Sequence, residues 1–299
     1  MKMTRPQRIF NWFNVGLMTL LCVTTLYPFL YVLAFSFNDS IDTLRGGLWI
    51  VPRVWTLDNY AAVLKDASIV NSFMISVSKT VIGTTIPILM CAMLSYALSD
   101  RQLPGRRWIT KYMFFTTMFS GGIVAYFLVL RSLGLYNNYL VYILPTMYGF
   151  HPFLIMRANF ENMPASIEES ARMDGAGDLR VFFSFILPLN KPIIATQALF
   201  TAVGQWNDWF GGMFFIKSEN LKPAATVLYE IVSQATFESS GMSSMNMRMN
   251  SAVGSGGALS TPQSMQMAFV VILTVPILMI YPFIQKYFVQ GVMVGSIKE

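Results

Sequence analysis

The chain has 299 residues, of which 54% are hydrophobic and only 12% are charged, and its mean hydropathy is +0.51. Because soluble domains carry roughly a quarter charged residues, this composition argues against a soluble protein. The net charge of +6 comes from basic residues that are dispersed among the loops and form no stripe. This pattern indicates contact with membrane lipid and argues against binding of nucleic acid.

Six apolar stretches are long enough to cross a hydrocarbon core of about 30 Å, which needs about 20 residues of helix. They cover roughly residues 14–37, 69–98, 110–130, 139–156, 193–216 and 265–285. The first stretch is too long for a signal-peptide core and lacks a convincing cleavage site, so we expect it to remain as a helix. Four of the spans contain a proline, which is tolerable because neighbouring helices can satisfy the freed carbonyls; these prolines are Pro28, Pro87, Pro145 and Pro276. The predicted fold class is an all-α membrane protein with six transmembrane helices.

The basic residues predict the orientation of these helices. With the N-terminus inside, the inner segments hold nearly twice as many Lys and Arg residues as the outer segments. This bias favours a topology with the N-terminus and the C-terminus both inside, N-in/C-in. Trp12 and Trp108 stand beside basic residues at inner helix starts, which is typical of the aromatic belt.

The outer segment after the first span carries the runs Leu48-Trp49-Ile50-Val51-Pro52-Arg53 and Thr56-Leu57-Asp58-Asn59-Tyr60. Together they resemble the pattern that carbohydrate-type ABC permeases carry after their first helix. The run Gln285-Lys286-Tyr287-Phe288-Val289-Gln290-Gly291 is similar to the ending of the same group. The Thr261-Pro262-Gln263-Ser264 entry to the last span looks most like permeases for complex or acidic oligosaccharides, such as pectin-derived fragments.

A polar stretch separates the fourth span from the fifth. Ser166 and Glu169 have the spacing of a capping box, which predicts a short helix that starts at Ile167. Gly175 and Gly177 supply positive-φ positions that end this helix. Asp178 then caps a second helix that runs toward Pro188. The sequence therefore predicts a helix, a glycine elbow and another helix, on the cytoplasmic side.

This stretch resembles the EAA loop of ABC importer permeases, although Ser170 replaces the second Ala of that pattern and Phe185 its Ile. The resemblance implies a type I ABC importer permease fold in which the first helix of the loop docks in a groove of a cytoplasmic ATPase. The coupling residues that it implies are Glu168, Glu169, Ala171, Arg172, Asp174, Gly175, Ala176 and Pro188.

The fifth span contains a polar cluster that a simple anchor helix would not tolerate. The cluster is Gln205, Trp206, Asn207, Asp208 and Trp209. We expect Trp206 and Trp209 to share a helix face. One interpretation is the lining of a substrate pathway, because aromatic faces pack on sugar rings and Asn or Asp binds hydroxyls. The other is an interfacial Trp pair whose polar neighbours bind an adjacent helix, and the sequence leaves both open.

Lys79 is the one basic residue well inside a span, about 15 Å below the outer face and close to the expected depth of Asp208. An unpaired ammonium there costs about 2.5–3.5 kcal/mol, so the residue needs a polar partner or a water-filled pathway. An ion pair with Asp208 or with a partner subunit, or snorkelling to the outer interface, satisfies this need. The alternative hypothesis is that Lys79 lines the pathway and offsets the charge of an acidic sugar.

The remaining polar and sulfur-containing residues predict no catalytic, cofactor or metal site. Cys22 and Cys91 lie in spans, and His151 lies beside Pro152 as an expected helix-end residue. The outer segment 239–264 reads as a flexible loop rich in Ser, Gly, Met and Asn. Its methionines are either copper ligands or, as we favour, part of an adaptable docking surface for an extracellular solute-binding protein; they are Met242, Met245, Met247 and Met249.

The resemblances together imply a multi-pass permease subunit of the bacterial cell membrane that imports a carbohydrate, and the Thr261–Ser264 run extends this expectation to an oligosaccharide containing uronate. Its implied partners are a second homologous permease, a cytoplasmic ATPase dimer that binds ATP and Mg, and the solute-binding protein. The expected parts are residues 1–66, a permease core over 67–290 with the EAA loop at about 160–190, and a tail over 291–299. A secondary transporter of small polar solutes is the alternative, whereas an intramembrane enzyme lacks its catalytic residues.

Overall fold

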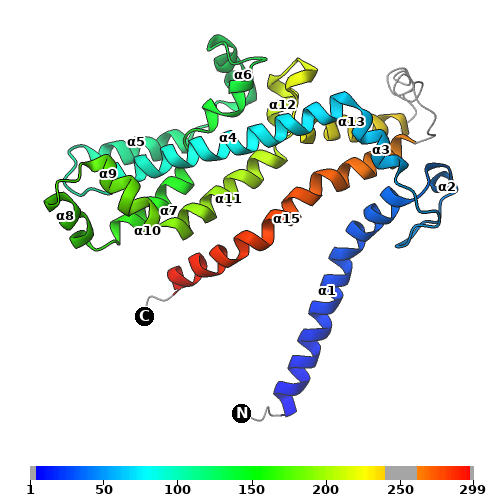
Figure 1. Ribbon diagram of the computed structural model, residues 1–299, viewed down its shortest axis with the longest axis horizontal. Coiled ribbons are helices and arrows are strands. Elements are labelled where there is room, and N and C mark those ends of the chain that lie inside the picture. The colour runs from blue at the N-terminus through cyan, green and yellow to red at the C-terminus, as the bar shows by residue number, and fades with distance from the viewer. Residues whose placement is uncertain (1–4, 240–260, 297–299) are drawn as a thin grey trace. The chain divides into compact units, whose positions relative to one another are not determined.

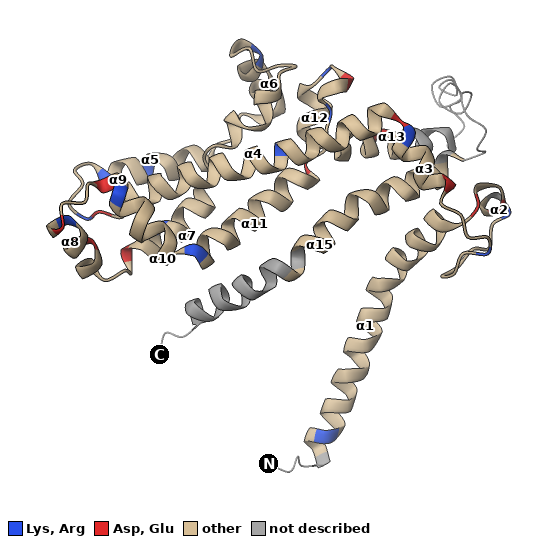
Figure 2. Ribbon diagram, viewed as in Figure 1, with Lys and Arg blue, Asp and Glu red and all other residues tan. Residues whose placement is uncertain are grey.

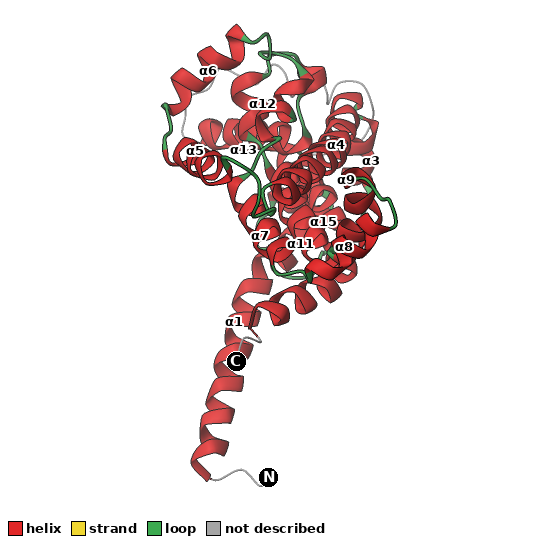
Figure 3. Ribbon diagram, turned by 90° about the vertical axis from the view of Figure 1, so that its left-hand side faces the viewer, coloured by secondary structure: helices red, strands yellow, loops and turns green. Residues whose placement is uncertain are grey.

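The computed structural model describes residues 5–239 and 261–296, which form helices joined by loops (Figure 3). The chain divides into two compact units, Met1–Val70 with Leu228–Val275 and Asn71–Val227 with Pro276–Glu299. In the described residues, three helices are long and apolar enough to cross a membrane, and three bent helix pairs raise this number to six. The predicted all-α membrane fold is therefore confirmed.

The first unit contains the long helix α1 (Arg5–Phe37), whose apolar side chains lie almost entirely on the surface of the chain. Trp12, for example, is 75% exposed. Exposed apolar area of this size requires lipid or another subunit around it. The other helices of this unit are α2 (Ser40–Leu44), α3 (Asp58–Lys65), most of α13 (Ala224–Ser239) and the first half of α15 (Pro262–Ser296).

A buried polar network fixes the segment between α1 and α3. The Asn59 side chain is fully buried; it donates to the carbonyls of Ser36 and Asn38 at 3.0 and 2.9 Å and accepts from the Ser40 hydroxyl at 2.7 Å. The Asn38 amide donates to Asp42, which also pairs with Arg53 at 2.9 Å. Because buried amides need partners, Asn59 orders this segment.

The second unit is built on α4 (Ala67–Ala97), which Figure 1 shows alongside α11 (Lys191–Asn207). Helix α7 (Phe150–Glu161) packs against both α11 and α5 (Arg106–Met118). The core between them contains Phe153, Met156 and Phe182, all less than 2% exposed. The short elements of this unit are α6 (Gly122–Ser132), η1 (Tyr139–Tyr142), η2 (Leu144–Thr146), α8 (Ala165–Met173), α9 (Asp178–Val181), η3 (Phe182–Ile186), α10 (Leu187–Leu189), α12 (Phe210–Phe215) and η4 (Glu219–Leu221).

The third and fourth predicted spans are bent within their predicted bounds. The third span bends by 116° between α5 and α6, where Gly121 and Gly122 follow each other and Gly122 has a φ of +76°. Two successive glycines favour a break because they lack a side chain that would restrict the backbone. The fourth span bends by 44° before α7. A third bend, of 83°, lies where α10 meets α11, just before the predicted start of the fifth span.

Candidate functional site

The helices α8 and α9 form the predicted hairpin at one end of the second unit, where Figure 2 shows charged residues gathered. Helix α8 ends in a Schellman motif. The Gly175 N–H donates to the carbonyl of Arg172 and the Ala176 N–H to that of Ala171, both at 3.0 Å, and Gly175 has a φ of +79°. The glycine elbow at Gly175 is confirmed. Gly177 has a φ of −71°, so the positive φ that we expected there is wrong.

The predicted caps of both helices are also wrong. Helix α8 begins at Ala165 after Pro164, and no side chain caps it. Proline fixes φ near −65° and suits the start of a helix, so Pro164 sets the start two residues before the expected one. Asp178 is the first residue of α9, not its N-cap, and its carboxylate pairs with Arg172 at 3.0 Å.

One side of the hairpin is anchored to the helix core. Ala171, Val181 and Phe182 are buried in the cluster around α7. The Tyr96 hydroxyl of α4 donates to Glu168 at 2.8 Å, and Arg172 pairs with the same carboxylate at 2.9 Å, which raises the pKa of Arg172. The hairpin and α4 are therefore joined by both apolar and polar contacts.

The other side of the hairpin is exposed. Met173 is 88% exposed, and Glu169 and Asp174 lie on the surface as well. Pro188 lies in α10, which connects the hairpin to α11. The predicted coupling residues thus divide into an inner group that holds the hairpin in place and an outer group that is open to a partner.

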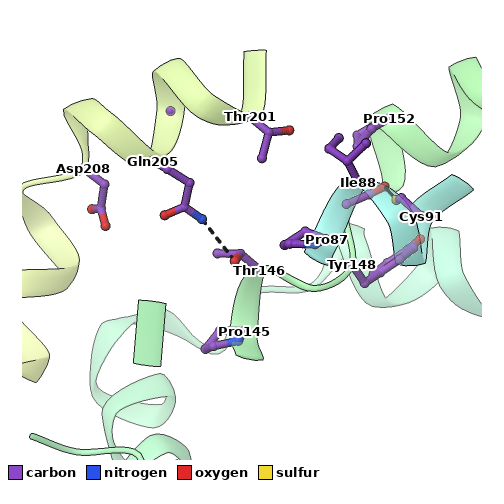
Figure 4. A pocket seen from close by; sticks show the side chains of 12 residues that line it. Pro87, Ile88, Cys91, Pro145, Thr146, Tyr148, Pro152, Thr201, Gln205 and Asp208 are labelled. Carbon is purple, nitrogen blue, oxygen red and sulfur yellow. Dashed lines mark hydrogen bonds between the residues drawn. The ribbon is translucent and has the colours of Figure 1, made fainter. Parts of the chain in front are cut away.

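A cavity of about 420 Å³ lies between α4, η2, α7 and α11 (Figure 4). Its polar lining includes Gln205, whose amide donates to the Thr146 hydroxyl at 3.1 Å. Gly83 allows α4 to approach α11 closely, because a Cβ at this position would lie 3.0 Å from the Gln205 side chain. The lining residues are Pro87, Ile88, Cys91, Pro145, Thr146, Tyr148, Gly149, Pro152, Thr201, Gly204, Gln205 and Asp208.

The carboxylate of Asp208 lies at the end of α11. Its Oδ2 accepts a hydrogen bond from Lys79 Nζ at 2.7 Å, and its Oδ1 accepts from the Gly211 N–H at 3.0 Å. The Lys79 side chain is fully buried, and its Nζ lies 4.5 Å from the centre of the Tyr142 ring. Of the outcomes expected for Lys79, the structure therefore shows the ion pair with Asp208.

The predicted polar cluster does not form one helix face, because α11 ends at Asn207 and Asp208 is extended. Trp206 is buried against Phe73 at a ring distance of 5.7 Å, and Trp209 contacts Phe210 at 5.9 Å. The expectation that Trp206 and Trp209 share a face is wrong. Of the predicted pathway residues, Gln205 and Asp208 line the cavity, whereas Lys79, Trp206, Asn207 and Trp209 do not.

Sequence reasoning missed most of the residues that line the cavity. Thr146 and Tyr148 lie beside the bend of the fourth span, and Thr201 lies one turn before Gln205 on α11. Pro87 and Pro145, which the sequence marks as prolines within spans, were the available signal. In the described residues no group of three or more His, Cys, Asp or Glu side chains is placed to hold a metal ion. The four methionines of the outer segment lie outside the described residues.

Comparison with known proteins identifies the family. Residues 74–294 match the family described as "Binding-protein-dependent transport system inner membrane component". The polygalacturonan/rhamnogalacturonan transport system permease protein YtcP of Bacillus subtilis is 36% identical over 97% of this chain and 99% of its own length. Protein LplC of the same organism is 33% identical over 99% of this chain and 97% of its own length.

The fold is similar to that of a solved transporter. A chain in the crystal structure of a bacterial ABC transporter involved in the import of the acidic polysaccharide alginate aligns with a TM-score of 0.87 and 27% identity. The alignment covers 96% of this chain and 99% of that chain. The protein therefore belongs to the inner membrane components of binding-protein-dependent transport systems, and it is an ABC permease subunit rather than an enzyme.

Proposed function

Because the chain is an ABC permease subunit, we propose that it forms half of the translocation pathway for an acidic oligosaccharide. It pairs with a second homologous permease, receives substrate from an extracellular solute-binding protein, and is driven by a cytoplasmic ATPase dimer. The relatives named for polygalacturonan and rhamnogalacturonan and for alginate support a substrate that contains uronate. The alternative of a secondary transporter does not agree with the family.

The α8–α9 hairpin is the observation that carries this proposal. Its inner side is fixed to α4 through Glu168 and Tyr96, and its outer side exposes Glu169 and Met173. A hairpin held in this way moves with the helices as a rigid body when a partner displaces it. We assign the docking of the ATPase to the outer side and the transmission of its movement to the inner side.

The ATPase partner supplies ATP and Mg in this proposal. The 299-residue sequence contains no G-x-x-x-x-G-K-[ST] run, so a phosphate-binding loop of this type is absent from it. The chain therefore contributes the pathway and the coupling surface, and no residue of it is assigned to nucleotide.

The cavity beside the α11 break provides the groups that a sugar needs. Gln205, Thr146 and Thr201 offer amide and hydroxyl groups that exchange hydrogen bonds with sugar hydroxyls. Asp208 adds a carboxylate, which would repel an anionic sugar if it were unpaired. Lys79 compensates this charge from behind the cavity wall. We therefore assign Lys79 a positioning role that acts through Asp208, in place of the direct contact with substrate expected from the sequence.

Uptake by the assembled transporter tests the proposal. Proteoliposomes that contain the complex should accumulate an oligogalacturonide only when ATP is present inside and the loaded binding protein outside. In the Lys79→Met variant, uptake of the oligogalacturonide should fall more than uptake of any neutral oligosaccharide that the complex accepts. Accumulation without ATP would contradict ATP-driven import. An equal loss of uptake for both sugars would contradict charge compensation by Lys79.

A further inference from the structure

A second pocket lies on the charged end of the second unit and is not part of the cavity described above. It has a volume of about 360 Å³ and lies between α5 and α7. Four of the side chains that line it are cationic and two are aromatic. The lining residues are Arg106, Arg107, Thr110, Lys111, Phe114, Phe150 and Arg157.

Two of the four cations are held by the protein itself. Glu161 accepts from Arg157 at 2.9 Å and from Arg106 at 3.1 Å, and Arg157 also donates to the Thr110 hydroxyl at 2.7 Å. Glu161 therefore compensates one charge and fixes two guanidinium groups, which leaves the pocket with an excess of positive charge.

The other two cations, Arg107 and Lys111, are exposed, and neither pairs with a carboxylate in the part of the chain that the structure describes. They lie one turn apart on α5, so their side chains leave the same face of the helix. Phe114 follows on this face after another turn and contacts Phe150 at a ring distance of 5.6 Å. From Arg107 to Phe114 the helix rises about 10 Å, so one face changes from cationic to aromatic along the direction that enters the membrane.

We propose that this pocket binds one anionic glycerophospholipid of the cytoplasmic leaflet. Its phosphate lies between Arg107 and Lys111, and its acyl chain lies against Phe114 and Phe150. Basic pockets between membrane helices on the cytoplasmic side suit anionic headgroups. The exposed Trp108 ring, 5.2 Å from Lys111 Nζ, belongs at the same interface. A free phosphate ion shares the headgroup chemistry but makes no use of the aromatic part.

Native mass spectrometry of the assembled, detergent-purified complex tests this site. Phosphatidylglycerol should bind with one tight site in this chain, whereas phosphatidylcholine should not fill it. The Arg107→Gln/Lys111→Gln variant should bind phosphatidylglycerol about 30-fold more weakly, since each charge contributes about fivefold. The swap Arg107→Lys/Lys111→Arg keeps the charge and should retain most of the affinity, which guards against an effect of misfolding.

The matched control is Arg101→Gln/Arg180→Gln, because both of these arginines are exposed at the same end of the unit and neither lines the pocket. This control should leave the tight site intact. Equal weakening in the control, equal binding of phosphatidylcholine, or displacement of the lipid by an equal concentration of inorganic phosphate would each overturn the proposal.

Discussion

Lys79 and Asp208 are 129 positions apart in the sequence, and their side chains form an ion pair with a distance of 2.7 Å between Nζ and Oδ2. The two partners differ in exposure, since the Lys79 side chain is 0% exposed and the Asp208 side chain is 34% exposed. The pair joins α4 to the break between α11 and α12. Lys79 Nζ also donates to the Asp208 carbonyl at 3.1 Å, so the residue that follows α11 is held by a side chain from another span.

The difference in exposure predicts unequal effects of removing each partner. Asp208→Asn leaves a fully buried ammonium without its counter-ion, and removing one partner of a buried ion pair lowers the free energy of unfolding by about 3–5 kcal/mol. Lys79→Met leaves a carboxylate that water reaches and that still accepts a hydrogen bond from the Gly211 N–H. We therefore expect a smaller loss of stability. The double variant should be more stable than Asp208→Asn alone. Thermal unfolding of the purified complexes measures this order, and equal losses for the two single variants would contradict it.

Gly175 should be required for its backbone conformation. It has a φ of +79°, and no atom lies within 4 Å of the position that a Cβ would occupy, so a side chain there meets strain but no clash. Gly175→Val should cost about 1–2 kcal/mol and should reduce ATP-driven uptake without reducing membrane insertion. Gly177→Ala is the matched control, because Gly177 also has free space but a φ of −71°. If Gly175→Val transports at the wild-type rate, the elbow has no role in coupling.

The predicted orientation can be measured with a thiol reagent that does not cross the membrane. Ser166 and Lys217 are both exposed. Single cysteines introduced at these positions, in a variant that lacks Cys22 and Cys91, should differ in their labelling by the reagent. The reagent should modify position 217 in intact cells and should reach position 166 only after the membrane is opened. Labelling of position 166 from outside would reverse the topology and separate the hairpin from any cytoplasmic ATPase.

The stability of the segment between α1 and α3 should depend on pH through the ionisation of Asp42. The hydrogen bond from Asn38, aided by Arg53, holds the pKa of Asp42 below its ordinary value of 3.8. Because the folded-state pKa lies below the unfolded value, the ionised carboxylate stabilises the segment fully above the unfolded value of about 3.8. This stabilisation is lost as the pH falls through the folded-state pKa. Hydrogen exchange of residues 38–57, corrected for the intrinsic rate at each pH, should accelerate below about pH 3.8 in the wild type.

The Asp42→Asn variant is the control for this titration, because it carries no carboxylate at this position. Its exchange should already be fast at neutral pH and should show no acid transition of its own. A wild-type transition that persists in Asp42→Asn would assign the pH dependence to another group.

Features that depend on neighbouring residues were predictable from the sequence. The elbow at Gly175 follows from the ability of glycine to adopt positive φ, and the spans follow from composition. The start of α8 was missed although its signal was local, because Pro164 fixes the first turn where a capping box was expected at Ser166. The need for a partner at Lys79 was also predictable, since a buried ammonium is costly.

Features that depend on distant residues were not predictable. Helix α11 ends at Asn207, where Asp208 pairs with Lys79 from another span, although the fifth span was predicted to continue to residue 216. The cavity draws Pro87, Pro145 and Gln205 from three different spans. No spacing within one span indicates which of its polar residues face such a cavity, so Trp206 and Asn207 could not be separated from Gln205 in advance.

Photo-crosslinking from Met173 shows whether the cytoplasmic ATPase docks on the outer side of the α8–α9 hairpin. This residue is the 88% exposed end of α8, where we place the ATPase. A photoreactive amino acid at position 173 of the chain, in the assembled complex, should give a crosslinked product that contains the cytoplasmic ATPase. The same amino acid at Leu128, which is 58% exposed on α6, should not. Absence of the ATPase product at position 173, or an equal yield at position 128, would contradict the assignment of the ATPase docking surface to the outer side of the hairpin.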